Sequence, residues 1–485
     1  MGAQTAKTAG DAATRQFAVA QALQAREHYD LAADEWTKFL KNHASDPRAG
    51  QAQYFLGVCR FKNKQYQEAI AAFLQVITAY PKSSQLSSAW LHLGLAQYNA
   101  AAGGQTDLYA KAAENLATVL KSFPQSKEVT QAAFYRGEAL YALGDKAEAA
   151  KLYAEVVEKH AKDPLVPEAL YALGVTQNEL GQTAAAGASY DAYLKQFPGG
   201  RHAAEVTLRR GEILFLQTQF EAAEKWFAAA AGRSDFKEAD VAAFRQATAL
   251  YELRKYSEAA ALYASIEQKF PQSKQVPAAR LAAGKSAFMA GDLDRAREQL
   301  AKCLSIGGAT GAEAAHWLAR GYLEEQKPDE AVKVIDAALP SAGPTPLAAQ
   351  LAMDRADALY EQPAKRREAA AAYADLAQKH PQDPLAPQAL YMAALTLLNA
   401  GDHSKALESS EQFLKQFAGK EPAADVEYIA AESNLQLGEY DGAIARYDRL
   451  LTRFPKRSDV STWQVRRGLA LFLNKKYADV LAALE

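Results

Sequence analysis

Apolar residues recur along this chain at the three- and four-residue intervals of a helical face, and the pattern restarts about every thirty-seven residues. One unit shows the spacing in full, at Leu56, Phe61, Ala69, Ile70, Phe73, Val76 and Ile77. This spacing predicts two helices, over about 48–63 and 66–80, joined by a short turn. No segment alternates with the two-residue period of a strand, so we expect an all-α chain.

A Tyr-x-x-Ala motif marks the start of the second helix in several units, as at Tyr66, Tyr256 and Tyr440. Most steps between equivalent marks are thirty-seven residues, for example from 29 to 66 and from 403 to 440. A fixed period in this range indicates stacked structural repeats that form a solenoid. A solenoid offers a long surface to partners and rarely a deep reactive pocket.

Turn signals separate the two helices of each unit and then one unit from the next. A glycine precedes the second helix at Gly144, Gly181, Gly291, Gly401 and Gly438. Glycine supplies the left-handed residue that ends a helix, and the Asp that follows it in several units can cap the next one. The second helix ends in an aromatic residue and proline, at Tyr80-Pro81, Phe123-Pro124, Phe197-Pro198, Phe270-Pro271 and Phe454-Pro455. Elsewhere Asp46-Pro47, Asp163-Pro164 and Asp383-Pro384 predict a capping acid before a first-turn proline.

The order of residues within a unit resembles a known repeat. A large residue, Leu-Gly, a small residue of the second helix and a closing proline appear at Trp90, Leu93, Gly94, Ala112 and Pro124. The preceding unit has the same order at Leu56, Gly57, Ala69, Phe73 and Pro81. Glycine returns in the first helix at Gly137, Gly174, Gly211, Gly284, Gly321 and Gly468. The pattern is similar to the tetratricopeptide repeat over nearly the whole chain. The resemblance implies a right-handed α-solenoid of about 12–13 helical hairpins, whose first helices line an inner, concave wall.

The sequence Tyr-Pro-Lys-Ser with a later Gly-Asp turn is similar to repeats of bacterial envelope proteins, of the Tol-Pal-associated division coordinator and outer-membrane assembly lipoprotein type. That resemblance implies a periplasmic or cell-envelope location, with a cytoplasmic scaffold as the alternative. Cys59 and Cys303 leave the redox compartment open. Residues 1–10 have no apolar signal core, and the unit that begins at Tyr477 stops after about two turns. We therefore expect a fragment without its targeting segment.

Composition narrows the class of partner. Lys and Arg number 55 and Asp and Glu 57, whereas a general nucleic-acid binder carries a basic stripe. No run of eighteen apolar residues exists, so we expect no direct membrane insertion. We expect protein or peptide partners and no nucleic acid. The segment Pro340–Pro346 is the most linker-like, and it predicts a hinge over 341–346 between a repeat array at 1–340 and one at 347–485, truncated in its last repeat.

Two sets of side chains are candidates for partner binding. Tyrosines recur at two positions of the first helix, at Tyr54, Tyr171, Tyr391 and Tyr428 and at Tyr98 and Tyr141. They predict an aromatic groove for a peptide, because Tyr gives contact area at low entropic cost; packing between repeats is the alternative. Acidic residues follow Arg-Gly or Arg-Ala at Glu138, Glu212 and Asp357. They predict a charged ladder that selects the partner, and salt bridges between adjacent helices are the alternative.

No catalytic, metal-binding or cofactor-binding motif stands out. The eight histidines include no His-x-x-x-His pair, and neither cysteine has a second one nearby. We expect a non-enzymatic scaffold or adaptor with no cofactor, which binds partners on the concave face. Two alternatives stay open: a docking or regulatory segment of a larger catalytic protein, and a scaffold that self-associates through exposed terminal repeats.

Overall fold

The computed structural model describes residues 2–343 and 346–482, in which there are twenty-six α-helices, one short 3-10 helix and no strand. The chain divides into two compact units between Gln219 and Phe220. The first unit holds α1 (Gly2–Ala25), α2 (Tyr29–Asn42), α3 (Ala49–Lys62), α4 (Tyr66–Ala79), α5 (Leu86–Ala102), α6 (Leu108–Ser122), α7 (Val129–Ala142), α8 (Lys146–Lys159), α9 (Val166–Glu179), α10 (Thr183–Gln196) and α11 (Ala203–Leu216).

The second unit holds α12 (Phe220–Ala231), α13 (Ala239–Glu252), α14 (Tyr256–Lys269), α15 (Val276–Met289), α16 (Leu293–Leu304), α17 (Gly308–Glu324), α18 (Pro328–Ala342), α19 (Pro346–Tyr360), the 3-10 helix η1 (Pro363–Lys365), α20 (Arg366–Lys379), α21 (Ala386–Asn399), α22 (His403–Phe417), α23 (Ala423–Gln436), α24 (Tyr440–Arg453), α25 (Val460–Leu473) and α26 (Tyr477–Ala482).

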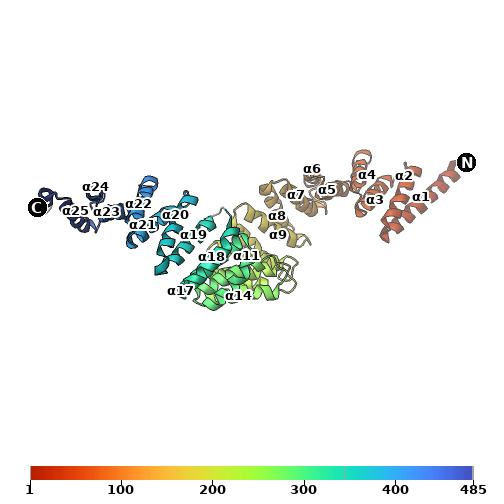
Figure 1. Cartoon of the computed structure of the whole chain (residues 1–485). Coiled ribbons are helices and arrows are strands. Elements are labelled where there is room, and N and C mark those ends of the chain that lie inside the picture. Colours follow the sequence, from red (N-terminus) through yellow and green to blue (C-terminus); the bar gives the residue numbers. More distant parts are fainter. Residues whose placement is uncertain (1, 344–345, 483–485) are drawn as a thin grey trace. The chain divides into compact units, whose positions relative to one another are not determined.

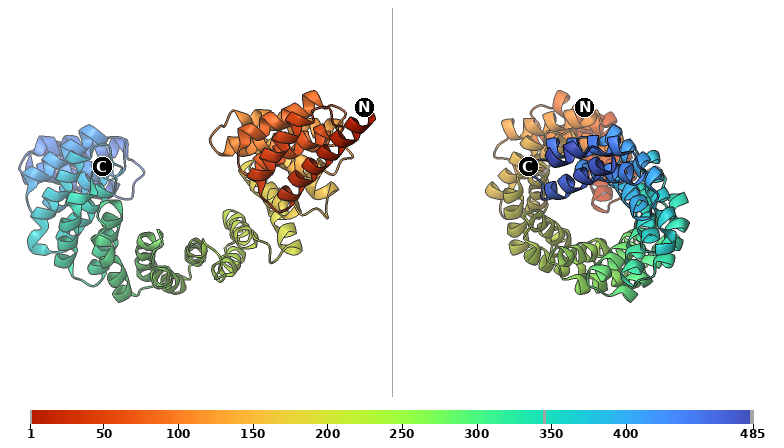
Figure 2. Two further views of the ribbon diagram at one scale, coloured as in Figure 1. Left: turned by 90° about the vertical axis from the view of Figure 1, so that its right-hand side faces the viewer. Right: turned by 60° about the vertical axis from the view of Figure 1, so that its left-hand side comes forward.

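Odd-numbered helices are the first helix of each hairpin, here called helix A, and even-numbered helices are the second, helix B. Within each unit every helix packs against the helices before and after it in the chain (Figures 1 and 2). Consecutive A helices also touch, as in α5 with α7, α15 with α17 and α21 with α23. The predicted all-α solenoid of helical hairpins is therefore confirmed. No helix in the described residues has both the length and the apolar character needed to cross a membrane.

Several hairpins within a unit close around one small residue of helix A, here called the crossing slot. A Cβ atom added to Gly57 would lie 2.5 Å from the Phe73 ring, and one added to Gly94 would lie 2.5 Å from Leu116. Helix B therefore approaches closely because these positions carry no side chain. In most A helices this position lies eight residues after the first, and an added Cβ would lie 2.4–2.7 Å from a helix-B side chain at Gly57, Gly94, Gly137, Gly174 and Gly284. Gly211, Ala247, Ala394, Ala431 and Gly468 have the same register, although a Cβ at Gly468 would meet nothing within 4 Å.

Helices α17 and α19 begin earlier than the other A helices, and this shifts their slots. Ala319 packs in one cluster with Ile335, and Ala356 packs with Tyr373. The sequence-based assignment of Gly321 to the slot is wrong, because a Cβ there would meet only Phe288, at 4.0 Å. Register, and not residue type alone, identifies the slot.

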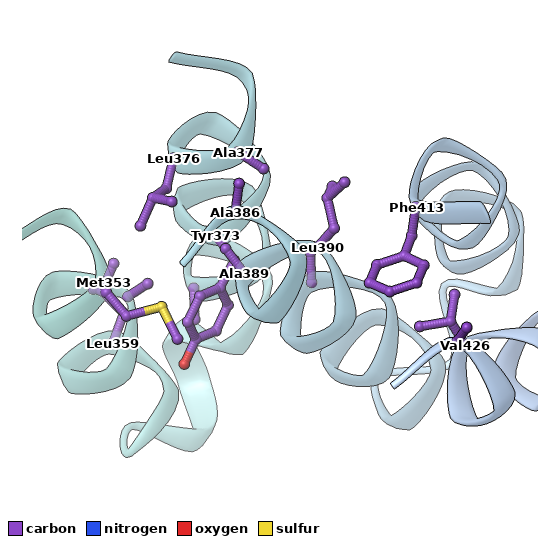
Figure 3. Packing of buried hydrophobic residues seen from close by; sticks show 14 residues of the cluster. Met353, Leu359, Tyr373, Leu376, Ala377, Ala386, Ala389, Leu390, Phe413 and Val426 are labelled. Atoms are coloured by element: carbon purple, nitrogen blue, oxygen red, sulfur yellow. The ribbon is translucent and has the colours of Figure 1, made fainter. Parts of the chain in front are cut away.

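The core is a seam of apolar side chains that runs from hairpin to hairpin within a unit. In the second unit one cluster includes Met353 of α19, Tyr373 of α20, Leu390 of α21, Phe413 of α22 and Val426 of α23 (Figure 3). All five are at most 9% exposed. Each helix thus buries side chains against both of its neighbours, which is how an array without one central core becomes stable.

The turns follow the predicted chemistry at the start of helix B. Gly144, Gly291 and Gly401 have φ values of 88°, 78° and 75°, in the left-handed region where glycine is favoured. The following Asp145 and Asp292 accept hydrogen bonds from the backbone amides of Glu148 (3.3 Å) and Arg295 (3.0 Å), which confirms them as helix caps. Among residues 2–343 and 346–482, six with positive φ are not glycines, namely Glu27, Lys64, Thr218, Arg254, Gln326 and Lys475.

The loop from helix B to the next helix A differs in one detail from the prediction. The carboxylates of Asp46, Asp163 and Asp383 accept from the amide two residues later, at 2.8–2.9 Å. These are turns that precede the helix, whose first residue comes later, at Ala49 in the first case. The proline after each Asp therefore lies in the turn and not in the first turn of the helix.

The hinge predicted over 341–346 falls partly outside the described residues, because 344–345 are not among them. On its two sides, α18 contains Pro340 and ends at Ala342, and α19 begins at Pro346. The hinge and the two-part division around it stay predictions.

Candidate partner-binding surface

The first set of predicted tyrosines lies three residues before the crossing slot, and its members pack toward the next helix A. Tyr54 is 8% exposed, and its hydroxyl lies 3.3 Å from Nδ1 of His92 in α5. Tyr171 stacks on His202 with ring centroids 4.0 Å apart and donates to Glu205 at 2.6 Å. Both contacts join consecutive hairpins. The burial of Tyr54 favours the packing interpretation for that residue, and we leave it out of the surface.

The two remaining tyrosines of this register, Tyr391 and Tyr428, are half-buried in the second unit. The ring of Tyr428 lies 6.4 Å from that of Tyr447 in helix B of the same hairpin. Burial is the main cause that raises the pKa of each phenol, so both are neutral hydrogen-bond donors at neutral pH. Part of each ring is left for a partner to contact.

The second set lies four residues after the slot and links A helices through hydrogen bonds. The Tyr98 hydroxyl donates to Glu138 at 3.4 Å, and the Tyr141 hydroxyl donates to Glu179 at 2.7 Å. Burial raises the pKa of Tyr141 to about 12, with the Glu179 carboxylate adding to the rise. Both rings stay half-buried, so they can offer an apolar face while their hydroxyls are held.

The acidic candidates lie one residue after the slot, and two of them accept hydrogen bonds from helix B. Glu138 accepts from Tyr153 at 2.7 Å as well as from Tyr98, which brings two predicted site residues together. Asp357 accepts from Tyr373 at 2.6 Å, and burial raises the pKa of its carboxyl group. Glu212 is half-buried at the same register of α11. Internal bonds thus occupy Glu138 and Asp357.

Three arginines that precede the slot point the other way, toward the preceding helix B. Each of these three pairs with an aspartate nineteen residues earlier, Arg210 with Asp191 (2.9 Å), Arg355 with Asp336 (2.6 Å) and Arg467 with Asp448 (2.5 Å). These are the salt bridges between adjacent helices that formed the alternative interpretation. Arg136 differs, because residue 117 is an alanine and the buried Nε of Arg136 has no hydrogen-bond partner among the described residues.

A further register was missed by sequence reasoning. The residue two before the slot is half-buried and large in several hairpins, at Phe55, His92, Tyr135, Trp317 and Met392. Consecutive residues of a helix are rotated by about a hundred degrees around its axis. The residue two before the slot is therefore not covered by the next helix A in the way that Tyr54 is. The position is identified by counting two residues back from the slot in each hairpin. A search for recurring tyrosines identifies only Tyr135 at this position.

Trp317 is the largest side chain of this register. The ammonium of Lys285 lies 5.5 Å and the guanidinium of Arg320 5.1 Å from its ring centroid. Arg320 follows the slot residue Ala319 and is exposed. We call the surface formed by Phe55, Tyr135 and Tyr141 in the first unit and by Trp317, Tyr391, Met392 and Tyr428 in the second the helix-A wall; each part is described within its own unit.

Within the described residues no three His, Cys, Asp or Glu side chains come together to hold a metal ion. Cys59 is fully buried, and burial raises the pKa of its thiol to about 11, which leaves it a protonated core residue at neutral pH.

Helical hairpins with a small crossing residue, stacked through one apolar seam, define an α-solenoid of short repeats. The tetratricopeptide repeat model matches residues 17–84, 89–164, 149–201, 244–307, 318–384, 364–421, 391–458 and 428–485. The chain belongs to the tetratricopeptide repeat family, whose repeat typically serves as a non-catalytic module for protein–protein interaction.

Among the solved structures, two similar helical-repeat chains have low identity to this one. A tetratricopeptide repeat protein from Parabacteroides merdae is 17% identical over 54% of this chain and 98% of its own, with a TM-score of 0.36. A chain from the structure of Naa15/Naa10 bound to HypK-THB is 17% identical over 96% of this chain and 73% of its own, with a TM-score of 0.33. No protein with a curated description matches the sequence. The family assignment depends on the repeats themselves.

Proposed function

We propose that this protein is a non-enzymatic scaffold that holds a protein or peptide partner along the helix-A wall. The observation that carries the proposal is the half-buried aromatic side chain two residues before the slot, at Phe55 and Tyr135 in the first unit and at Trp317 in the second. Large aromatic side chains that are partly open in the free protein are the usual anchors of an interface. Their partial burial also lowers the entropic cost of holding them in place.

The test uses the full chain and a partner first identified by affinity capture and then purified. Replacing Tyr135 or Trp317 by Ala should weaken its binding about tenfold or more, the scale of an interface anchor. Leu74 is 42% exposed on helix B, and Leu74→Ala is the matched control that should leave binding unchanged. If the wall substitutions and Leu74→Ala weaken partner binding equally, the helix-A wall is not the binding surface.

For the location we propose the periplasm or the cell envelope. The support is the resemblance of the Tyr-Pro-Lys-Ser repeats to those of bacterial envelope proteins, and the two buried cysteines are compatible with either redox compartment. Fractionation of cells that express the full-length tagged gene product tests it. Recovery of the protein with cytosolic markers alone would contradict the proposal and favour a cytoplasmic scaffold.

Self-association is a second candidate, favoured by the apolar surface of α25. Val465 is 71%, Phe472 55% and Leu469 38% exposed on that helix. Adjacent apolar side chains in the open favour contact between copies of a chain. Light scattering over a concentration series should show a rising mass, and Phe472→Glu should suppress it. A constant monomer mass would dismiss this candidate without affecting the helix-A wall.

A further inference from the structure

A carboxylate site is built into the hairpin of α23 and α24. The hydroxyl of Tyr447, which is fully buried, donates to Oε1 of Glu432 at 2.5 Å. Nε of Arg466, in the next helix A, donates to the same oxygen at 2.6 Å, and a second guanidinium nitrogen donates to Oε2. A tyrosine of helix B and an arginine of the following helix A thus converge on one carboxylate.

Three other hairpins have tyrosine at this helix-B position with its hydroxyl hydrogen-bonded to a side-chain oxygen of helix A. In all three the acceptor lies one residue after the slot. The pairs are Tyr153 with Glu138 (2.7 Å), Tyr263 with Thr248 (2.8 Å) and Tyr373 with Asp357 (2.6 Å). This follows from the cost of leaving a buried hydroxyl without a partner.

The hairpin of α9 and α10, with the following helix α11, has the tyrosine and arginine donors but no carboxylate at the position one residue after the slot. Tyr190 is 0% exposed, and its hydroxyl has no hydrogen-bond partner. Val175 takes the place that Glu432 has in the other hairpin, and Arg209 takes that of Arg466. The spacings are identical, at fifteen residues from acceptor position to tyrosine and thirty-four from acceptor position to arginine.

Arg209 is occupied here by a residue of its own helix. Its Nε and one Nη donate to a single oxygen of Glu205, at 3.0 and 2.8 Å, and Tyr171 donates to that same oxygen. The Arg209 side chain is 36% exposed, so it can turn from Glu205 to another acceptor. Burial raises the pKa of Tyr190 and the Arg209 charge opposes that rise, which leaves the phenol protonated and able to donate at neutral pH.

We propose that a carboxylate of the partner segment enters beside Val175 and accepts hydrogen bonds from the Tyr190 hydroxyl and the Arg209 guanidinium. The Tyr447–Glu432–Arg466 site shows that this protein already holds a carboxylate with the same two donors. The ligand is therefore an aspartate or glutamate side chain. The inference rests on the proposed function, because it names the chemistry of a segment that lies on the helix-A wall.

The probe is a fluorescent, end-blocked octapeptide of alternating Gly and Glu, with the Gly-Gln octapeptide as its uncharged match. Anisotropy at low salt should show the Glu peptide binding the full chain about tenfold more tightly, as two charge-assisted hydrogen bonds imply. Tyr190→Phe should remove most of that preference, and Val175→Glu should abolish it by supplying an internal carboxylate. A Gly-Gln peptide with a free C-terminus tests whether a terminal carboxylate enters instead.

A reciprocal variant tests the same geometry in the other unit. Glu432→Val should open a second site between Tyr447 and Arg466, and the number of Glu peptides bound per chain should double. Equal affinity for the Glu and Gln peptides, or binding that Val175→Glu leaves unchanged, would overturn the proposal. If Tyr135→Ala still weakens the captured partner, only this inference fails and the helix-A wall stands.

Hydrogen exchange separates a binding role of Tyr190 from a structural one. Tyr447→Phe removes the hydrogen bond from Tyr447 to Glu432 and should speed exchange in α23 and α24. Tyr190→Phe removes an unpaired buried hydroxyl, so exchange in α9 and α10 should stay the same or slow. Equal acceleration by the two variants would mean that the Tyr190 hydroxyl is already paired, which contradicts the proposal.

Discussion

The same substitution, glycine to alanine, should have opposite effects at two positions of helix A. A Cβ at Gly57 would lie 2.5–2.9 Å from three atoms of the fully buried Phe73 ring, whereas one at Gly321 meets only Phe288, at 4.0 Å. Alanine gains about 1 kcal/mol over glycine inside a helix, and overpacking a core costs about 1–3 kcal/mol. We expect Gly321→Ala to stabilise its hairpin by about 0.5–1 kcal/mol, and Gly57→Ala to destabilise its own by about 1–2 kcal/mol.

The assay is hydrogen exchange followed by mass spectrometry, because an array of repeats need not unfold in one step and a single melting temperature averages over its hairpins. Exchange in α17 and α18 should slow severalfold in Gly321→Ala. Exchange in α3 and α4 should speed up by about fivefold or more in Gly57→Ala. Slower exchange in both variants would refute the close crossing of helices at the slot.

Two further outcomes follow from local geometry. Lys64 has a φ of 60°, so Lys64→Gly should stabilise α3 and α4 by about 1 kcal/mol. Gly144 has a φ of 88°, so Gly144→Ala should destabilise α7 and α8 by about 1 kcal/mol. Hydrogen exchange in these four helices measures both effects. Burial lowers the pKa of His92 below its ordinary 6.5, so its contribution to stability is present above that value and is lost as pH falls below it. Exchange in α3 to α5, corrected for the intrinsic rate, should speed up from pH 7 to pH 5. His92→Phe should flatten that response, and an unchanged slope would refute it.

The repeat, its two helices and its turns could be predicted because each depends on residues close together in the chain. Gly144-Asp145 ends one helix and caps the next through contacts within a few residues. The slot could be predicted only in part, because the repeat that leads to α17 is shorter than the usual one. The step from Gly284 to Ala319 is thirty-five residues, and the usual step of thirty-seven leads to Gly321, which lies outside the slot.

The candidate surface was harder to predict, because it depends on which face the next hairpin covers. Tyr54 and Phe55 are adjacent and both aromatic, yet the next helix A covers Tyr54 to 8% exposure and leaves Phe55 half-buried. The hydroxyl partners of Tyr153 and Tyr190 depend on one position, Glu138 or Val175, fifteen residues earlier. Such pairs could be found from the sequence by comparing equivalent positions across repeats, once the register is known from the slot.

The most direct test of the helix-A wall is hydrogen exchange of the full chain with and without its purified partner. The account predicts protection on odd-numbered helices, strongest over the peptides that contain Tyr135 and Trp317, while even-numbered helices stay as they are. Protection confined to even-numbered helices would contradict it.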